Sequence, residues 1–519
     1  AEERYKVEKD VISSHYSNRV LIIDEVHNLR DEKDTSSEGE EDIKETKDVI
    51  RKVIEYSENM KLILLSATPL FNKSTEIVWL MNLLLSNDNR PKLSMGELFE
   101  KIEDDYVLND DAETILMEKT RGYVSYLRGE NPISFPIRLY PDFNKDPRCM
   151  CPRDSPTKGF NGTDAISPFR FMKLYRSMMA DSEDDFDQIS FYNSYIESLE
   201  NKSKLSLSER NIGIQLSNIV YPDETDDQTY EDVYGERGFK QLMNEQPSKY
   251  SYKDNNTPIF RLDKLDKLSC KMHTMLSSLR DDKAEGIIFI YTEYIYSGIL
   301  PIALALEHMG FEKYNNNNLL DYPEWTKDGD PQKMKGKPID YQWNTDTKLQ
   351  RAKYIILSGN RDLSPNNDNE IKRVRNENKD GQHIKIIIGN SVTREGIDFK
   401  NIREIHILDP WYHLYKIEQV IGRGIRYCSH NEYENIGDRN VTVYNHVAMV
   451  EKDTESVDTN TYRIAEDKAE DIGKIENVLK QNAIDGYLNK QVNYIHQLNK
   501  IQIMSSRGTS EEADINDQP

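Results

Sequence analysis

The residues whose chemistry is easiest to interpret lie in the segment 415–426, YKIEQVIGRGIR. They are Gln419, Gly422, Arg423 and Arg426, which follow the pattern Q-x-x-G-R-x-x-R. Two arginines three positions apart on a helix share a face, so we expect both guanidinium groups to reach one anionic ligand. Arginine suits phosphate because its planar fork pairs with two oxygens and keeps its charge at neutral pH. The pattern predicts a phosphate-binding helix, with a solvated basic helix end as the alternative.

A second group of polar residues, DEVH at 24–27, directly follows the apolar run RVLII at 19–23. Asp24 can hold Mg²⁺ through water, because this ion takes one or two carboxylates and fills its shell with water and phosphate oxygens. Glu25 is then placed to orient and deprotonate an attacking water. His27 can couple this site to another domain. The alternative is a chance acidic pair after a strand.

The segment SAT, from Ser66 to Thr68, follows another apolar run, KLILL at 61–65. Polar residues at the carboxyl ends of neighbouring parallel strands meet at one edge of the sheet. We therefore expect the hydroxyl groups of Ser66 and Thr68 to hydrogen-bond the acidic pair. A helix N-cap or a turn stabilised by these hydroxyls is the alternative.

The segment TREGIDF, residues 393–399, also follows an apolar run. Thr393 and Arg394 are candidates for contact with a nucleic-acid backbone, and Gly396 permits tight backbone geometry. Asp398 can sense the ribose of a nucleotide or the two arginines. The alternative is an ordinary turn between a strand and a helix.

The elements that must position these groups follow an α/β pattern, because short apolar runs alternate with helical stretches. An acidic, low-complexity stretch at 31–46 is expected to be a mobile loop. We expect strands at 19–23, 61–65, 285–292, 354–359, 384–390, 403–409 and 441–450, and helices at 47–59, 74–86, 168–180, 186–201, 264–280, 301–311 and 461–504.

The charge and the cysteines limit the class of protein. A net charge of −23 over 519 residues argues against a nucleic-acid coat protein. It does not exclude an enzyme that moves along nucleic acid, because such an enzyme binds the phosphates within one local cleft. No apolar run approaches the length of a membrane span, and no secretion signal is visible. The four cysteines are expected to be thiols in a reducing compartment; they are Cys149, Cys151, Cys270 and Cys428.

In this order, DEVH, SAT, TREGIDF and QVIGRGIR resemble motifs II, III, V and VI of superfamily 2 helicases. Longer blocks resemble one viral branch, the early transcription factor small subunit and nucleoside triphosphate phosphohydrolase I of poxviruses and their giant-virus relatives. These blocks are DEVHNLR, RGYVSYLRGENPISFPIRLYP, IFIYTEYIYSGILPIALALEHMGF and YRIAEDKAEDIGKIENVLKQNAIDGYLN. The resemblance covers most of the chain except 145–260 and 315–350.

The resemblance implies two RecA-like parallel-sheet domains, of which the first is incomplete. A largely helical insertion separates them, and a helical extension follows. The expected boundaries are 1–145 for the first domain, 146–280 for the insertion, 281–450 for the second domain, 451–505 for the extension and 506–519 for a disordered tail.

The resemblance also implies ATP and Mg²⁺ as cofactors. It makes Glu25, Arg423 and Arg426 catalytic and places Asp24, His27, Gln419, Gly396 and Asp398 at the nucleotide, with Asp24 facing Mg²⁺ through water. Ser66 and Thr68 would couple the nucleotide to nucleic acid, which Thr393 and Arg394 would contact.

One motif of the family does not occur in this sequence. No Gly-rich loop ends in Gly-Lys-Ser/Thr, and the two Gly-Lys pairs, at 336–337 and 473–474, lack the loop glycines and the hydroxyl that binds Mg²⁺. In the family this loop precedes the DEVH box. A sequence truncated at its N-terminus is our expectation. A loop carried by a second chain and a subunit that does not hydrolyse ATP are the alternatives.

The resemblance thus implies an ATP-dependent translocase that acts on DNA, or on RNA, during viral transcription. Its expected partners are the viral RNA polymerase or a second transcription-factor subunit, without a membrane. We expect it in the virion and the host cytoplasm, or in the nucleus, and not outside the cell. The rival interpretation is a scaffold that recruits polymerase or promoter DNA; a restriction-type translocase is a third, although no nuclease residues are visible.

Overall fold

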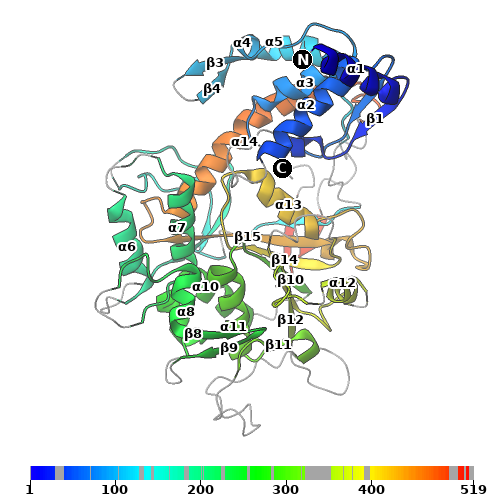
Figure 1. Cartoon of the computed structure of the whole chain (residues 1–519). Coiled ribbons are helices and arrows are strands. Elements are labelled where there is room, and N and C mark those ends of the chain that lie inside the picture. The colour runs from blue at the N-terminus through cyan, green and yellow to red at the C-terminus, as the bar shows by residue number, and fades with distance from the viewer. Residues whose placement is uncertain are drawn as a thin grey trace. The chain divides into compact units, whose positions relative to one another are not determined.

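The protein is described from a computed structural model (Figure 1). The structure describes residues 2–29, 40–70, 72–102, 105–127, 134–141, 145–162, 164–180, 186–199, 202, 204–223, 228–253, 258–281, 286–316, 318–321, 352–365, 367–376, 378–390, 398–489, 501–507 and 510–513. Contacts between Cα atoms divide the chain into two compact units, Ala1–Arg128 with Asp467–Tyr494, and Gly129–Glu466 with Ile495–Pro519. Each unit has hydrophobic clusters of its own.

The first unit contains a pair of parallel strands, β1 (Val20–Ile23) and β2 (Lys61–Leu64). Both strands are rich in apolar residues that suit an extended backbone. One face of the pair packs with α2 (Glu40–Tyr56) and α3 (Glu76–Asn87). The helix α2 begins inside the stretch 31–46 that we expected to be a loop, of which 31–39 lies outside the described residues.

The opposite face of this strand pair is apolar and exposed. The exposed fractions are 59% for Val20, 58% for Ile22, 44% for Ile63 and 45% for Leu65. Successive side chains of a strand alternate between its faces, so these four lie on one side. The two strands lie where the sequence predicts them, but this face is exposed among the described residues. Parallel sheets ordinarily have both faces covered.

The rest of the first unit is mainly helical. Its second hydrophobic cluster joins α3 to residues of α14 (Val457–Gln481), of which roughly the last four turns, from Asp467 on, belong to this unit. The remaining elements are α1 (Glu2–Tyr16), η1 (Val26–Leu29), α4 (Met95–Leu98), β3 (Phe99–Ile102), β4 (Asp105–Leu108) and α5 (Ala112–Thr120).

The second unit is built on a nine-stranded sheet, visible as the group of arrows around β10, β14 and β15 in Figure 1. Its order is β11-β12-β13-β10-β14-β15-β7-β6, and β5 also pairs with β15. Every pairing is parallel except that of β6 with β7. The strands are β5 (Ile137–Leu139), β6 (Cys149–Met150), β7 (Leu174–Met178), β10 (Ile287–Tyr291), β11 (Glu312–Lys313), β12 (Lys353–Leu357), β13 (Ile386–Gly389), β14 (Ile402–Ile407) and β15 (Asn440–Met449).

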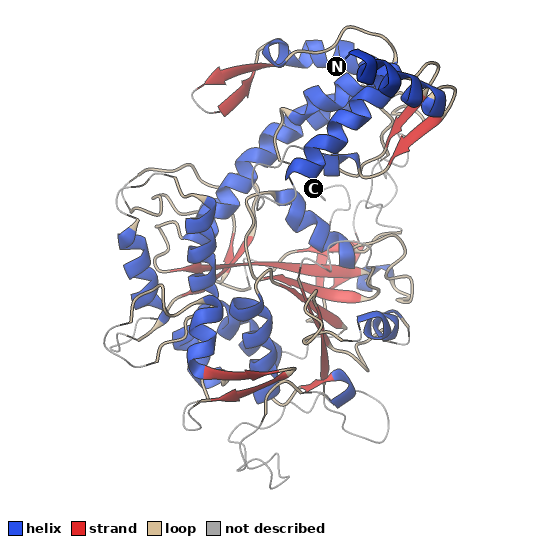
Figure 2. Cartoon of the chain, in the orientation of Figure 1, coloured by secondary structure: helices blue, strands red, loops and turns tan. Residues whose placement is uncertain are grey.

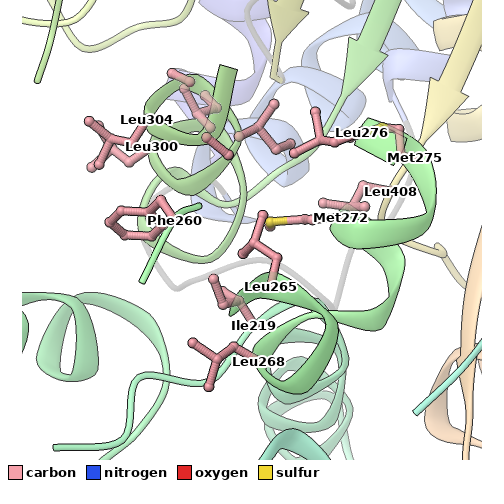
Figure 3. Packing of buried hydrophobic residues seen from close by; sticks show 14 of the residues in the cluster. Ile219, Phe260, Leu265, Leu268, Met272, Met275, Leu276, Leu300, Leu304 and Leu408 are labelled. Carbon is pink, nitrogen blue, oxygen red and sulfur yellow. The ribbon is translucent and has the colours of Figure 1, made fainter. Parts of the chain in front are cut away.

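Both faces of this sheet are covered. Ile288 and Ile290 of β10 belong to one hydrophobic cluster, whereas Ile287 and Phe289 belong to another. Figure 3 shows the first cluster, in which Met272 and Leu276 approach Leu300 and Leu304 of the neighbouring helix. Such continuous apolar strands are typical of parallel sheets enclosed by helices, which surround these strands in Figure 2.

The helices and smaller elements of the second unit complete this arrangement. They are η2 (Pro152–Asp154), α6 (Gln188–Ser198), α7 (Leu207–Asn218), α8 (Gly235–Leu242), β8 (Met243–Gln246), β9 (Lys249–Tyr252), α9 (Leu262–Leu268), α10 (Cys270–Asp281), η3 (Ile295–Ile299), α11 (Leu300–His308), η4 (Tyr314–Asn316), α12 (Asn367–Arg375), α13 (Leu414–Gly424), η8 (Ile436–Asp438), β16 (Ile501–Met504) and β17 (Ser510–Ala513).

The predicted α/β class, with a RecA-like parallel sheet and the helix α14 after it, is confirmed. The division of the chain differs from the predicted boundaries, because β5, β6 and β7 join the sheet of the second core. The predicted helix at 168–180 is wrong: it contains β7, which pairs with β15. The tail expected to be disordered from 506 contains β17, which pairs with β16.

Candidate functional site

In the first unit the DEVH residues lie where β1 ends. Asp24 is exposed, and its Oδ1 accepts a hydrogen bond from the backbone N of Glu25 at 3.0 Å. Glu25 has a φ of 51°, in the left-handed region that side chains rarely adopt. This conformation turns the chain sharply after the strand and leaves the Glu25 side chain 54% exposed. Backbone strain of this kind is common at functional sites.

His27 links the two strand ends. Its imidazole is buried, and Nδ1 lies 2.9 Å from Ser66 Oγ and 3.3 Å from Glu25 Oε2. The backbone N of Thr68 donates to the same Ser66 hydroxyl at 3.1 Å. The structure thus brings the DEVH and SAT residues to one sheet edge. The expectation that Ser66 bonds the acidic pair is wrong, because its hydroxyl contacts His27 instead. Thr68 Oγ1 is buried and makes no hydrogen bond with any described residue.

The oxygen ligands at this edge suit Mg²⁺ better than a softer metal. Asp24 offers one exposed carboxylate, which fits an ion held mainly by water and phosphate. Within the described ranges no three His, Cys, Asp or Glu side chains are grouped closely enough to hold a metal by themselves. The site would therefore bind Mg²⁺ together with a phosphate ligand, because the protein alone would not supply all of the ligands.

In the second unit the Q-x-x-G-R-x-x-R residues lie on and just after α13. Arg423 is buried in the last turn of this helix, and Gln419 Nε2 donates to Tyr415 Oη at 2.7 Å. A Cβ on Gly424 would lie only 2.9 Å from Ile405 Cδ1, so this glycine permits the helix to pack closely on β14.

Arg426 does not share a helical face with Arg423, which corrects the prediction. Helix α13 ends at Gly424, and Ile425 has φ −102° and ψ 89°. Arg426 Nε instead lies 2.9 Å from Asp398 Oδ1, in a pair that is about half exposed. The two arginines are therefore held differently, one inside the fold and the other at its surface.

Asp398 connects Arg426 to a further arginine. Arg375 Nε, at the end of α12, donates to the carbonyl oxygen of Asp398 at 2.8 Å. The side chain and the backbone of one residue thus each contact a guanidinium group. The predicted residues Thr393, Arg394 and Gly396 lie outside the described residues.

A small pocket opens beside α13 at the carboxyl ends of β10 and β14. It is lined by Tyr291, Glu293, Ile407, Asp409, Trp411, Lys416, Ile417 and Val420. The Lys416 ammonium lies 3.0 Å from the centre of the Trp411 ring and also pairs with Glu293. Burial raises the pKa of Asp409, although hydrogen bonds from Asn218, Thr292 and the backbone N of Glu293 oppose this shift.

Three of the residues that hold α13 were missed by the sequence interpretation, namely Arg138, Glu293 and Lys416. Arg138 binds Glu418 through both of its terminal nitrogens. Arg138 and Glu293 lie in two of the blocks that resemble the viral branch, which was the available signal. Neither is part of a recognisable short motif, so their pairing with α13 was visible only in three dimensions.

Part of the second unit matches a known protein family. Residues 339–428 match the family described as helicase conserved C-terminal domain. This range contains Asp398, Gln419, Arg423 and Arg426.

Three relatives come from large viruses. The chain is 28% identical to "Putative ATP-dependent RNA helicase L377" of Acanthamoeba polyphaga mimivirus, over 95% of this chain and 43% of that protein. It is 27% identical to "Putative helicase 087L" of Invertebrate iridescent virus 3, over 92% of this chain and 40% of that protein. It is 36% identical to "Nucleoside triphosphatase I" of Choristoneura biennis entomopoxvirus, over 23% of this chain and 18% of that protein.

The chain spans less than half the length of each of these relatives. The matches relate it to viral superfamily 2 helicases and nucleoside triphosphatases. None of the helices in the described part of the chain combines the length and apolar character needed to cross a membrane.

Proposed function

We propose that this chain, a relative of viral superfamily 2 helicases, forms part of an ATP-dependent motor that moves along DNA or RNA during viral transcription. The observation that carries the proposal is the placement of Gln419, Arg423 and Arg426 on and just after α13, inside the range that matches the helicase C-terminal family. The last turn of this helix packs against the start of β14, and Arg426 pairs there with Asp398.

Each residue has a role in this proposal. Glu25 accepts a proton from the attacking water, and Asp24 holds Mg²⁺ through water. Arg423 binds the terminal phosphate, and Arg426 stabilises the charge that develops there. Gln419, Gly396 and Asp398 orient these groups toward the nucleotide. Bound Mg²⁺ would neutralise phosphate charge.

The remaining roles concern coupling and binding. The buried His27–Ser66 contact, with Thr68, links the strand end that carries Glu25 to the neighbouring strand end. Thr393 and Arg394 contact the nucleic-acid backbone. The proposed partners are the viral RNA polymerase or a second transcription-factor subunit. The proposed location is the virion and the host cytoplasm, or the nucleus.

The test is ATP hydrolysis by the product of the complete open reading frame, measured without nucleic acid and with single-stranded DNA, duplex DNA or RNA. We expect hydrolysis that one of these polymers stimulates, and loss of that activity in Glu25→Gln. Lys158→Gln, which alters an exposed lysine of the second unit, is the control. Absence of stimulated hydrolysis in the unaltered protein would refute the motor.

The sequence itself favours one alternative, a scaffold that recruits polymerase or promoter DNA, because it contains no Gly-Lys-Ser/Thr phosphate loop. A scaffold would bind nucleic acid or polymerase with equal affinity in the presence and absence of ATP, and Glu25→Gln would leave that binding unchanged. The same protein preparations distinguish the two functions.

A further inference from the structure

Helix α13 is held by two ion pairs whose members lie outside the Q-x-x-G-R-x-x-R pattern. Arg138 Nη1 donates to Glu418 Oε1 at 2.9 Å, and Nη2 donates to Oε2 at 2.5 Å. Two parallel bonds of this kind fix orientation as well as distance. Nearer the start of the helix, the buried Lys416 ammonium pairs with Glu293, just after β10.

The backbone of Arg138 is fixed independently of α13. Arg138 is the central residue of β5 and lies opposite Val441 in the parallel pairing with β15. The preceding residue, Ile137, donates its backbone N to Arg439 O at 2.7 Å. The Arg138 side chain is only 6% exposed, whereas Glu418 is 45% exposed. Arg138 is therefore the partner that the sheet fixes, and Glu418 is the partner through which the helix is oriented.

The position of Glu418 on α13 allows its contact with Arg138 to affect the orientation of the proposed phosphate-binding residues. Glu418 directly precedes Gln419 and lies five residues, or about 1.4 turns, before Arg423. Because a helix is stiff over this length, the Arg138 fork sets the rotation of α13 about its axis. Because Glu418 is 45% exposed, we expect the pair to add little to the stability of the whole unit and to act on the orientation and local order of α13.

We propose that Arg138 is a positioning residue, which acts through Glu418 to hold Gln419 and Arg423 toward the nucleotide. This inference rests on the proposed function of α13. The inference assigns a role to the block RGYVSYLRGENPISFPIRLYP. This block resembles the viral branch but contains no catalytic motif. Arg138 does not touch the substrate in this proposal, and loss of its charge acts through the helix alone.

The first test is hydrogen–deuterium exchange of the 519-residue chain. Arg138→Gln should accelerate amide exchange in peptides from 414–424 by about tenfold, the effect of roughly 1.4 kcal/mol of local stability. Peptides from β10 and the thermal midpoint should change little. Exchange of charges in Arg138→Glu with Glu418→Arg should restore protection. Arg148→Gln, which removes a comparable pair with Asp146, is the control. Unchanged exchange in α13, or equal acceleration throughout the unit, would overturn the inference.

The second test is steady-state ATP hydrolysis by the product of the complete open reading frame. Arg138→Gln and Glu418→Gln should each lower kcat by about tenfold to a hundredfold, since small misplacement of a positioning group has such effects. The KM for ATP should change by less than about threefold. The double variant should lose no more than either single variant, because both act through one contact.

The two failures can be told apart. An inactive unaltered protein would refute the motor, while the exchange measurement would still decide whether Arg138 orders α13. An active protein whose kcat is unaffected by Arg138→Gln would refute the positioning role and leave the motor intact.

Discussion

Arg426 is the residue on which the proposed chemistry depends most directly. Its guanidinium group is at the surface, paired with Asp398, and can exchange that partner for a phosphate without breaking the core. Arg423 is buried and cannot move as freely. The structure therefore separates a buried arginine from an exposed one, although the sequence pattern treats them as equivalent.

We predict that Arg426→Ala in the product of the complete open reading frame lowers kcat by about 10³–10⁵, the range for arginines that stabilise phosphoryl transfer. Arg426→Lys should not restore activity, because a single ammonium group cannot reproduce the planar fork. Steady-state ATPase kinetics measure both effects. Nucleic-acid affinity at fixed salt should stay within about threefold of the unaltered protein. A kcat close to that of the unaltered protein would show that Arg426 has only a structural role.

A second residue-scale prediction concerns pH. Burial raises the pKa of Glu307 to about 7, although hydrogen bonds from Tyr354 Oη and from the backbone N of Leu320 and Leu319 oppose this shift. In the unfolded chain its ordinary value is 4.5. Between these values the folded protein binds a proton that the unfolded chain has released, so the free energy of unfolding falls as pH rises through this window.

In Glu307→Gln the free energy of unfolding should therefore fall less steeply between about pH 4.5 and pH 7, apart from any constant cost of the substitution. Urea unfolding at several pH values measures this slope. Glu451→Gln, at an exposed position, should keep the slope of the unaltered protein. If Glu307→Gln keeps it as well, the carboxyl group does not titrate in this range.

The contacts made by these residues show what the sequence could predict. The DEVH and SAT segments reach one sheet edge as expected, because both follow apolar strands. Their hydrogen bonds differ from the expectation, since His27, which follows the left-handed turn at Glu25, contacts Ser66. The sequence contains no glycine or asparagine at position 25 that would have predicted such a turn.

At the scale of elements, the C-terminal segment shows how a tertiary contact overrides composition. Polar sequence after 505 predicts disorder, yet Ser506 Oγ donates to the buried Glu404 at 2.6 Å. Arg507 binds both oxygens of the same carboxylate, at 2.9 and 3.0 Å. Burial alone would raise the pKa of Glu404, but Arg507 and His406 hold it well below its ordinary value.

We predict that Arg507→Met lowers the free energy of unfolding by about 3–5 kcal/mol, because it leaves the Glu404 charge buried without its partner. The double variant Arg507→Met with Glu404→Gln should recover much of this loss. Chemical denaturation at neutral pH measures both. Arg237→Met, which removes an exposed pair with Asp232, should change stability by less than about 1 kcal/mol. Equal effects of the Arg507 and Arg237 substitutions would show that the segment is not anchored.

The strands β5, β6 and β7 were missed for a related reason. They are two to five residues long and lack a clear alternation of apolar and polar residues. Their pairing partners lie in β15 or in one another, and β15 is more than 250 residues away along the chain. The continuously apolar strands β10 and β13, and the mostly apolar β14, needed no such information, because buried parallel strands carry their signal locally.

At the scale of the whole molecule, the missing phosphate loop leads to a direct prediction. The 519-residue chain alone should hydrolyse ATP no faster than its Glu25→Gln variant, because its sequence contains no Gly-Lys-Ser/Thr loop to supply the lysine and amide groups that position the phosphates. The measurement is phosphate release at saturating Mg²⁺, ATP and nucleic acid. Hydrolysis that depends on Glu25 would show that other residues of this chain bind the phosphates.

The exposed apolar face of β1 and β2 should affect how molecules of this protein attract one another in solution. At low ionic strength the net charge of −23 keeps molecules apart. At about 0.1 M salt the screening length shrinks to about 10 Å, and short-range attraction between patches around Val20, Ile22, Ile63 and Leu65 then dominates. The second virial coefficient from light scattering should fall from positive to negative as salt increases. Ile22→Asp should raise the salt concentration at which the coefficient changes sign. The face of this one pair of strands would then set the protein concentration at which the chain remains in solution.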